Sequence, residues 1–123
     1  MKLCISSLKV RNLWESKGYE LPAFDMQDIK ESTLREPIWL HFGAGNVFRA
    51  LPAALHQTLL DKDFCHRGIT VCEVFDEEII KKIYDPYDNL SVVVSIRSDG
   101  SMQKRVIGSV SEALTASEDF ERL

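Results

Sequence analysis

The chain has 123 residues, enough for one domain with a buried core. Its 45% hydrophobic and 28% charged residues are typical of a globular protein. The net charge is −4, so the chain lacks the basic excess with which proteins bind phosphate backbones, and we expect no nucleic-acid partner. No apolar run reaches the roughly 20 residues that cross a bilayer, so no membrane partner is expected either.

The cysteines and histidines indicate neither a disulfide scaffold nor a metal site. Cys4, Cys65 and Cys72 are odd in number and form no Cys-x-x-Cys pair, which favours a reducing compartment. The first fourteen residues carry Lys9 and Arg11 and no cleavage site of a signal peptide. The cytoplasm is therefore the predicted location.

Residues 1–36 are mixed in character and are predicted to form an N-terminal extension that packs on a domain at 37–123. The short apolar run at 38–42 is predicted to be a buried strand, and a glycine-rich turn follows at 43–46. Apolar residues then recur in steps of three and four, as on one face of a helix. Pro52 is accepted only in the first turn of a helix, so this helix is predicted to begin near Phe48 or Arg49.

The second strand is predicted at Ile69–Val74, whose continuous apolar character is typical of a parallel strand that is covered on both faces. A short helix opens at Asp76 and closes at Lys82, with the charge order that a helix dipole favours. Strands are predicted at 90–96 and 102–110, in a hairpin around Ser98-Asp99-Gly100.

This order of elements predicts an α/β fold. Strand, helix and strand in succession place the two strands side by side in a parallel sheet. We therefore expect a partial Rossmann-like, nucleotide-binding domain with a parallel sheet and a β-hairpin. The capping-box spacing at 115–118 predicts that one more helix begins there.

The glycine turn suits a dinucleotide for physical reasons. Gly43 permits a tight exit from the strand, Gly45 lets the backbone approach phosphate oxygens, and the helix start favours an anion. Phe48 replaces the third glycine of the usual Gly-x-Gly-x-x-Gly pattern. A short Gly-x-Gly turn alone is equally consistent with a plain loop. The strand before the turn, the helix after it and an acid at the end of the second strand favour the nucleotide.

That acid is Glu73, with Asp76 close behind it. A carboxylate at this position accepts hydrogen bonds from an adenosine ribose and repels the 2′-phosphate of NADP. The alternative is a solvated charge at the end of a strand.

Several segments resemble the mannitol dehydrogenase family, the polyol-specific long-chain dehydrogenases that act on mannitol, mannitol 1-phosphate, fructuronate and tagaturonate. The string from Ile38 to Ala50, with its His-x-Gly-x-Gly and Arg-Ala, is similar to the family's first strand and turn. Shorter resemblances lie at 21–25, 70–74 and, farther on, at 88–90, 106–109 and 112–114. Pro52 and Phe48 depart from the pattern.

The resemblance implies an NAD-dependent oxidoreductase that transfers a hydride between NAD and a polyol, ketose or keto-uronate. It implies that the cofactor contacts the turn, the start of the helix and the acids, namely Phe42, Gly43, Ala44, Gly45, Asn46, Val47, Phe48, Arg49, Glu73 and Asp76. It also implies a C-terminal catalytic helical domain that binds the small-molecule substrate and supplies a lysine. We find no Lys-x-x-x-x-Asn-x-x-His pattern, so we expect the chain alone to be inactive, with self-association through uncovered edges as a hazard.

The sequence is also consistent with other interpretations. The main alternative is a non-catalytic nucleotide-binding module or a domain that binds S-adenosylmethionine. His41 is expected to be a packed, hydrogen-bonded structural residue, and His56 and His66 are expected to be solvated. Arg49 could contact a phosphate or the face between two domains, and a surface ion pair is equally consistent with the sequence. The acids at 76–78 are expected to cap a helix rather than to bind a cation, because their side chains fan out around it.

Overall fold

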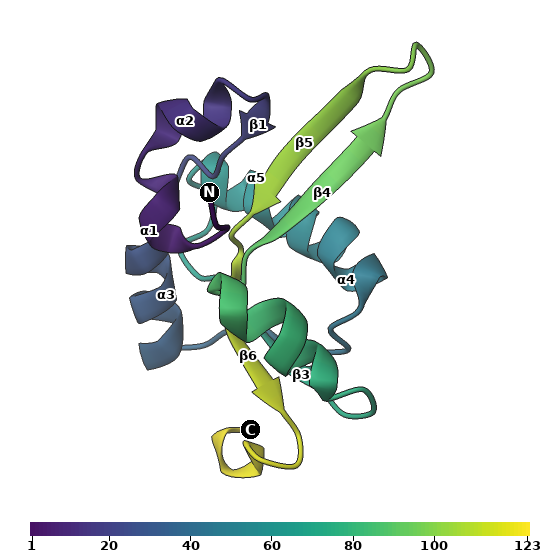
Figure 1. Cartoon of the computed structure of the whole chain (residues 1–123). Helices are drawn as coiled ribbons and strands as arrows, with labels where there is room; N and C mark the ends of the chain where they lie inside the picture. Colours follow the sequence, from purple (N-terminus) through teal and green to yellow (C-terminus); the bar gives the residue numbers. More distant parts are fainter.

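The computed structural model describes residues 1–123 and contains two three-stranded sheets. The first sheet is parallel, with strand order β2-β3-β6, and its strands are β2 (Leu40–Phe42), β3 (Ile69–Glu73) and β6 (Val110–Thr115). The second sheet has the order β1-β5-β4, in which β1 is the short strand Tyr19–Glu20. Strands β4 (Ser91–Ile96) and β5 (Met102–Ile107) form a hairpin that projects from the body of the molecule (Figure 1). The predicted α/β class, with a parallel sheet and a hairpin, is confirmed.

The centre of the parallel sheet is β3, which is buried along its whole length. Phe42 lies opposite Cys72 on one side, and Leu114 lies opposite Cys72 on the other. The main apolar core forms where the helices that follow β2 and β3 cover this sheet. Its buried members include Ala44, Phe48, Ala53, Ile69, Val71, Ile80 and Tyr84.

The helix after the glycine turn begins earlier than predicted and is interrupted. Helix α4 (Asn46–Ala50) begins directly after Gly45, not near Phe48 or Arg49, and α5 (Pro52–Asp61) begins at Pro52. Leu51 separates them with φ −120° and ψ −75°. A proline at the first position of a helix loses no intrahelical bond, so the break at Leu51 accommodates Pro52 without a late start of α4.

A helical segment follows Asp76 as predicted, but it is irregular and extends farther than Lys82. It contains a π-helical turn, η1 (Ile80–Tyr84), and a 3₁₀ turn, η2 (Asp85–Tyr87). The buried side of η1 is formed by Ile80 and Tyr84.

Two predictions near the C-terminal end are wrong. The strand predicted at 102–110 ends at Ile107, and the chain passes through Gly108 and Ser109 into β6 of the other sheet. Gly108 donates its N–H to Gln57 Oε1 (2.5 Å), and Ser109 accepts the N–H of Ile69 (2.8 Å), so tertiary contacts end one strand and start the next. The helix predicted from Thr115 is absent because Thr115 still pairs with Glu73 in β6, and only η3 (Phe120–Arg122) follows.

Residues 1–36 contribute four short elements, which lie together on one side of the molecule (Figure 1): α1 (Ile5–Leu8), α2 (Arg11–Glu15), β1 (Tyr19–Glu20) and α3 (Met26–Arg35). Strand β1 pairs in parallel with β5. A second apolar cluster joins Leu8, Trp14 and Leu21 to Leu90 and Val106. The domain boundary at residue 37 stays a prediction.

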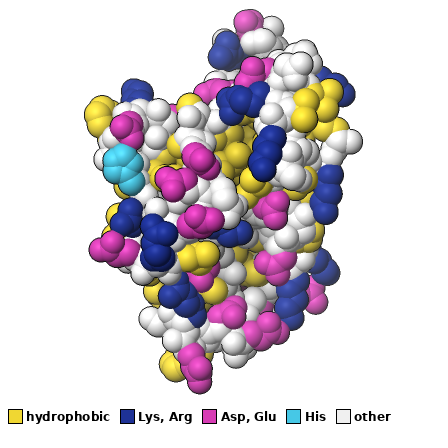
Figure 2. All heavy atoms as spheres, turned by 90° about the vertical axis from the view of Figure 1, so that its left-hand side faces the viewer, with side chains coloured by type: hydrophobic (Ala, Val, Ile, Leu, Met, Phe, Trp, Pro, Cys, Tyr) yellow, Lys and Arg dark blue, Asp and Glu magenta, His cyan; other side chains and the backbone are white.

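The outer surface of this N-terminal side carries acidic and basic side chains that are intermixed, with hydrophobic side chains between them (Figure 2). None of the helices is long and apolar enough to cross a membrane.

Candidate functional site

The glycine turn leaves the parallel sheet at the end of β2. Gly43 has φ +105°, a conformation that a residue with a side chain rarely adopts, and its N–H donates to the carbonyl of Cys72 (2.8 Å). Gly45 has an ordinary φ of −79°, and a Cβ added there would meet no atom within 4 Å. Gly43 is therefore required by the turn itself, whereas Gly45 keeps an open space beside the backbone.

Glu73, the predicted acid at the end of β3, points into the protein. Its Oε1 accepts the N–H of Ala44 (2.9 Å), in the middle of the glycine turn. Its Oε2 accepts the N–H groups of the next three residues, Val74, Phe75 and Asp76 (3.1, 3.1 and 3.4 Å). The hydrogen bond from Ala44, followed by those from the loop, holds the pKa of this buried carboxyl below its usual range, although burial opposes the shift.

Tyr84 is a site residue that sequence reasoning missed. Its hydroxyl donates to the carbonyl of Ala44 (2.9 Å), and burial raises the pKa of the phenol. The two residues stand 40 positions apart. The sequence signals only that Tyr84 lies on the apolar side of a helical segment, so its polar contact was not predictable.

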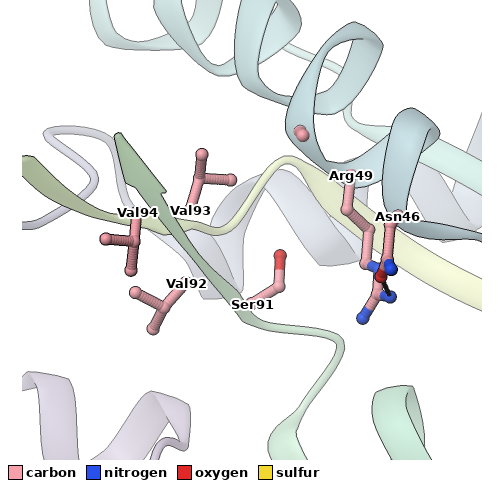
Figure 3. A pocket seen from close by; sticks show the side chains of 7 residues that line it. Asn46, Arg49, Ser91, Val92, Val93 and Val94 are labelled. Atoms are coloured by element: carbon pink, nitrogen blue, oxygen red, sulfur yellow. Dashed lines mark hydrogen bonds between the residues drawn. The ribbon is translucent and has the colours of Figure 1, made fainter. Parts of the chain in front are cut away.

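Arg49 lies across the start of α4. Its guanidinium donates to Asn46 Oδ1 and to the carbonyl of Gly45 (3.4 Å), and it lies 5.7 Å from the centre of the Tyr84 ring. It forms no ion pair with a carboxylate, so of the alternatives that the sequence left open for Arg49, the surface ion pair is absent. Figure 3 shows Arg49 and Asn46 at one wall of a groove whose other wall is β4, from Ser91 to Val94.

Asp76 differs from Glu73 in its surroundings. Its side chain is exposed and makes no hydrogen bond or ion pair, so it is free to meet a ligand. Of the next two acids, Glu77 accepts hydrogen bonds from the backbone and hydroxyl of Ser117 (3.1 and 2.7 Å), and Glu78 pairs with Lys82 (2.9 Å). No group of histidine, cysteine and acidic residues in the structure could hold a metal ion.

The remaining predicted site residues divide into exposed and buried ones. Phe42 and Val47 are 58% and 77% exposed beside the turn. Phe48 is buried, and its ring stacks on His41 with 4.5 Å between the ring centres. Phe48 therefore offers only its backbone to a ligand. His41 packs against Phe48 and Trp39 as predicted, but its ring lacks the hydrogen bond that was also expected.

One histidine prediction is wrong. His56 is buried, not solvated, and its Nε2 lies 2.6 Å from the carbonyl oxygen of Arg67. The helix α5 turns this side chain toward the loop before β3, which no local pattern reveals. His66 is exposed, as predicted.

No family model matches this chain, whereas a curated protein resembles it in sequence and several solved structures resemble it in fold. The chain is 46% identical over 114 residues to the D-mannonate oxidoreductase of Thermotoga maritima, a match over 93% of this chain and 21% of that protein. The mannitol 2-dehydrogenase of Pseudomonas fluorescens, solved as a ternary complex with NAD and D-mannitol, superposes with a TM-score of 0.77 at 22% identity. A substrate-free D-sorbitol dehydrogenase superposes with a TM-score of 0.72 at 23% identity.

This chain corresponds to the N-terminal domain of the mannitol dehydrogenase family. Each structural match covers 99% of the chain and 23% of the neighbour, so the chain spans about a fifth to a quarter of the length of the known proteins that it matches. The resemblance that runs from about Leu21 to Leu114 is thereby confirmed for the family and the fold.

Proposed function

We propose that this chain binds NAD(H) and is the nucleotide-binding part of an oxidoreductase that transfers a hydride between NAD and a polyol, ketose or keto-uronate. The observation that carries the proposal is the glycine turn between β2 and α4, which is open beside Gly45 and adjoins an acidic loop after β3. The D-mannonate oxidoreductase at 46% identity supports the reaction class. The neighbour that was solved with NAD and D-mannitol supports the cofactor.

The cofactor would lie along the turn, with its pyrophosphate beside Gly45 and the first N–H groups of α4, which have no acceptor within the helix. Its ribose would face the loop of Glu73 and Asp76. Two unit charges about 4 Å apart repel by roughly 4 kcal/mol at an effective dielectric near 20, so an exposed carboxylate there disfavours the 2′-phosphate of NADP. We therefore propose a preference for NAD over NADP.

The substrate would be a sugar acid or polyol that is held by a further domain. The known relatives are roughly four to five times longer than the region that this chain matches, and the chain has no Lys-x-x-x-x-Asn-x-x-His pattern to supply the proton transfer that the family implies. We propose that the residues described here bind the cofactor and that the chain by itself does not catalyse the reaction.

Exposed apolar side chains on two parts of the domain support a larger assembly around it. Val47, Leu51, Leu55 and Leu59 are exposed on α4 and α5 and at the break between them. Ile38, Leu40 and Phe42 are exposed along β2, on the face of the parallel sheet opposite these helices, because Trp39 and His41 between them pack against His56 and Phe48. We propose that a further domain covers part of this surface, and that copies of this chain associate where the surface is left uncovered.

The three cysteines are unpaired in the structure. This arrangement suits the reducing cytoplasm, which we propose as the location.

Titration with NADH, followed by its fluorescence, tests the cofactor proposal, with S-adenosylmethionine as the competing ligand. We expect saturable binding of NADH and none of S-adenosylmethionine. Saturable binding of S-adenosylmethionine alone would assign the domain to the alternative function.

A further inference from the structure

Both backbone polar groups of Ala44, in the middle of the glycine turn, are held by buried side chains. Its N–H donates to Glu73 Oε1 and its carbonyl accepts the Tyr84 hydroxyl, each at 2.9 Å. Glu73 is 9% exposed, Tyr84 1% and Ala44 not at all. The two partners come from the end of β3 and from η1, so the turn is tied to two segments that lie far from it in the sequence.

Glu73 has little capacity left for a ligand. A carboxylate offers about four acceptor positions, and four backbone N–H groups already lie around this one. By contrast, the carboxylate of Asp76 is exposed and has no partner. The two acids, which the sequence pattern treats alike, therefore differ in what they can contact.

We propose that Glu73 is a positioning residue, which together with Tyr84 fixes the glycine turn in its binding conformation and leaves the contact with the ribose to Asp76. This inference rests on the proposed function. Gly43 has few steric limits on its backbone, so a turn without these bonds would sample other conformations, and ordering it would cost part of the binding free energy. We call the two hydrogen bonds from Glu73 and Tyr84 to Ala44 the clamp. The clamp acts on the turn that binds the pyrophosphate, so its effect on affinity is the same with and without a phosphate on the ribose.

The decisive experiment measures the dissociation constants of both NADH and NADPH for Glu73→Gln, with Glu78→Gln as a matched control on an exposed, non-site glutamate. For Glu73→Gln we expect both constants to rise by a similar factor of roughly tenfold or more, the size of losing one charged hydrogen bond, with their ratio unchanged. Glu78→Gln should change neither. A change in the ratio with the NADPH constant unaffected would make Glu73 a direct ribose ligand and overturn the proposal.

Two further measurements support the test: a second variant that keeps the core packed, and an exchange measurement that needs no nucleotide. Tyr84→Phe retains the buried ring and removes only the bond to Ala44, so it should also weaken both nucleotides with an unchanged ratio; unaltered affinities would contradict the clamp. Hydrogen exchange of the Ala44 amide without nucleotide should be slow in the wild type and faster in Glu73→Gln. Equal exchange in both would overturn the clamp, whereas a wild type that binds no NADH would refute the proposed function alone.

Discussion

Gly43 donates its N–H to the carbonyl oxygen of Cys72 across 2.8 Å, so the contact between the first two parallel strands extends one residue beyond the end of β2. The chain then leaves the sheet at Gly43 with φ +105°. Gly43 permits the tight turn out of the sheet, whereas Gly45 keeps the space beside the backbone open. Substitutions at the two positions should therefore have different effects on stability and on binding.

Gly45→Val should abolish binding of NADH while the fold stays intact. The backbone at Gly45 has an ordinary φ and its Cβ position is free of neighbours, so the folded chain tolerates a side chain that would occupy the space of the pyrophosphate. Fluorescence titration and a thermal melt measure the two effects. NADH affinity equal to that of the wild type would refute the placement of the pyrophosphate.

Gly43→Ala is the matched contrast and should lower stability. Its Cβ also has free space, so the expected loss of about 1–3 kcal/mol comes from backbone strain at positive φ. Urea denaturation measures the free energy of unfolding. If the loss is absent, the turn does not require the backbone conformation that Gly43 adopts here.

Asp76→Asn should narrow the preference for NAD over NADP. The variant removes an exposed negative charge that has no partner in the protein, so stability should change little and the ratio of the NADPH and NADH dissociation constants should fall by about tenfold. Glu78→Gln removes a neighbouring charge and should leave the ratio as it is. An unaltered ratio in Asp76→Asn would exclude its carboxylate from the ribose site.

Gln57→Leu should destabilise the protein by about 2–4 kcal/mol. The buried amide donates to the carbonyl of Val106 (2.6 Å) and accepts the N–H of Gly108 (2.5 Å), so the variant leaves two buried backbone groups without partners. Gln103→Leu makes the same chemical change at an exposed position, where we expect less than about 0.5 kcal/mol. Urea denaturation compares them, and similar losses would contradict a special role of Gln57.

The contribution of Glu73 to stability should disappear in acid. Its pKa is lowered in the folded state, so the carboxylate stabilises the fold above the ordinary value of about 4.3 and loses this contribution as the pH falls through the lowered folded-state value. The difference in the free energy of unfolding between the wild type and Glu73→Gln should therefore be largest at neutral pH and shrink below about pH 4.3. Urea denaturation along a pH series measures it, and a constant difference would contradict the assignment.

Local patterns in the sequence were sufficient for much of this domain. The run from Ile69 to Cys72 is mostly apolar without alternation, which is typical of a strand covered on both faces, and it forms most of the central strand. Gly43 and Gly100 both have positive φ, where a glycine is favoured. The positions of these glycines in the sequence therefore predicted the turn after β2 and the hairpin between β4 and β5. The string from Ile38 to Ala50 also placed the chain in its family.

Only the tertiary structure decided how distant groups are paired. The end of β5 at Gly108 depends on a hydrogen bond to Gln57, 51 positions earlier. Thr115, where the capping-box spacing predicts a helix, instead pairs with Glu73 as the last residue of β6. The same holds at the site, where Glu73 and Tyr84 reach Ala44 across 29 and 40 positions. Periodicity and turn chemistry act over a few residues, whereas a buried donor finds its acceptor only after the core has packed, because burial then makes an unpaired polar group costly.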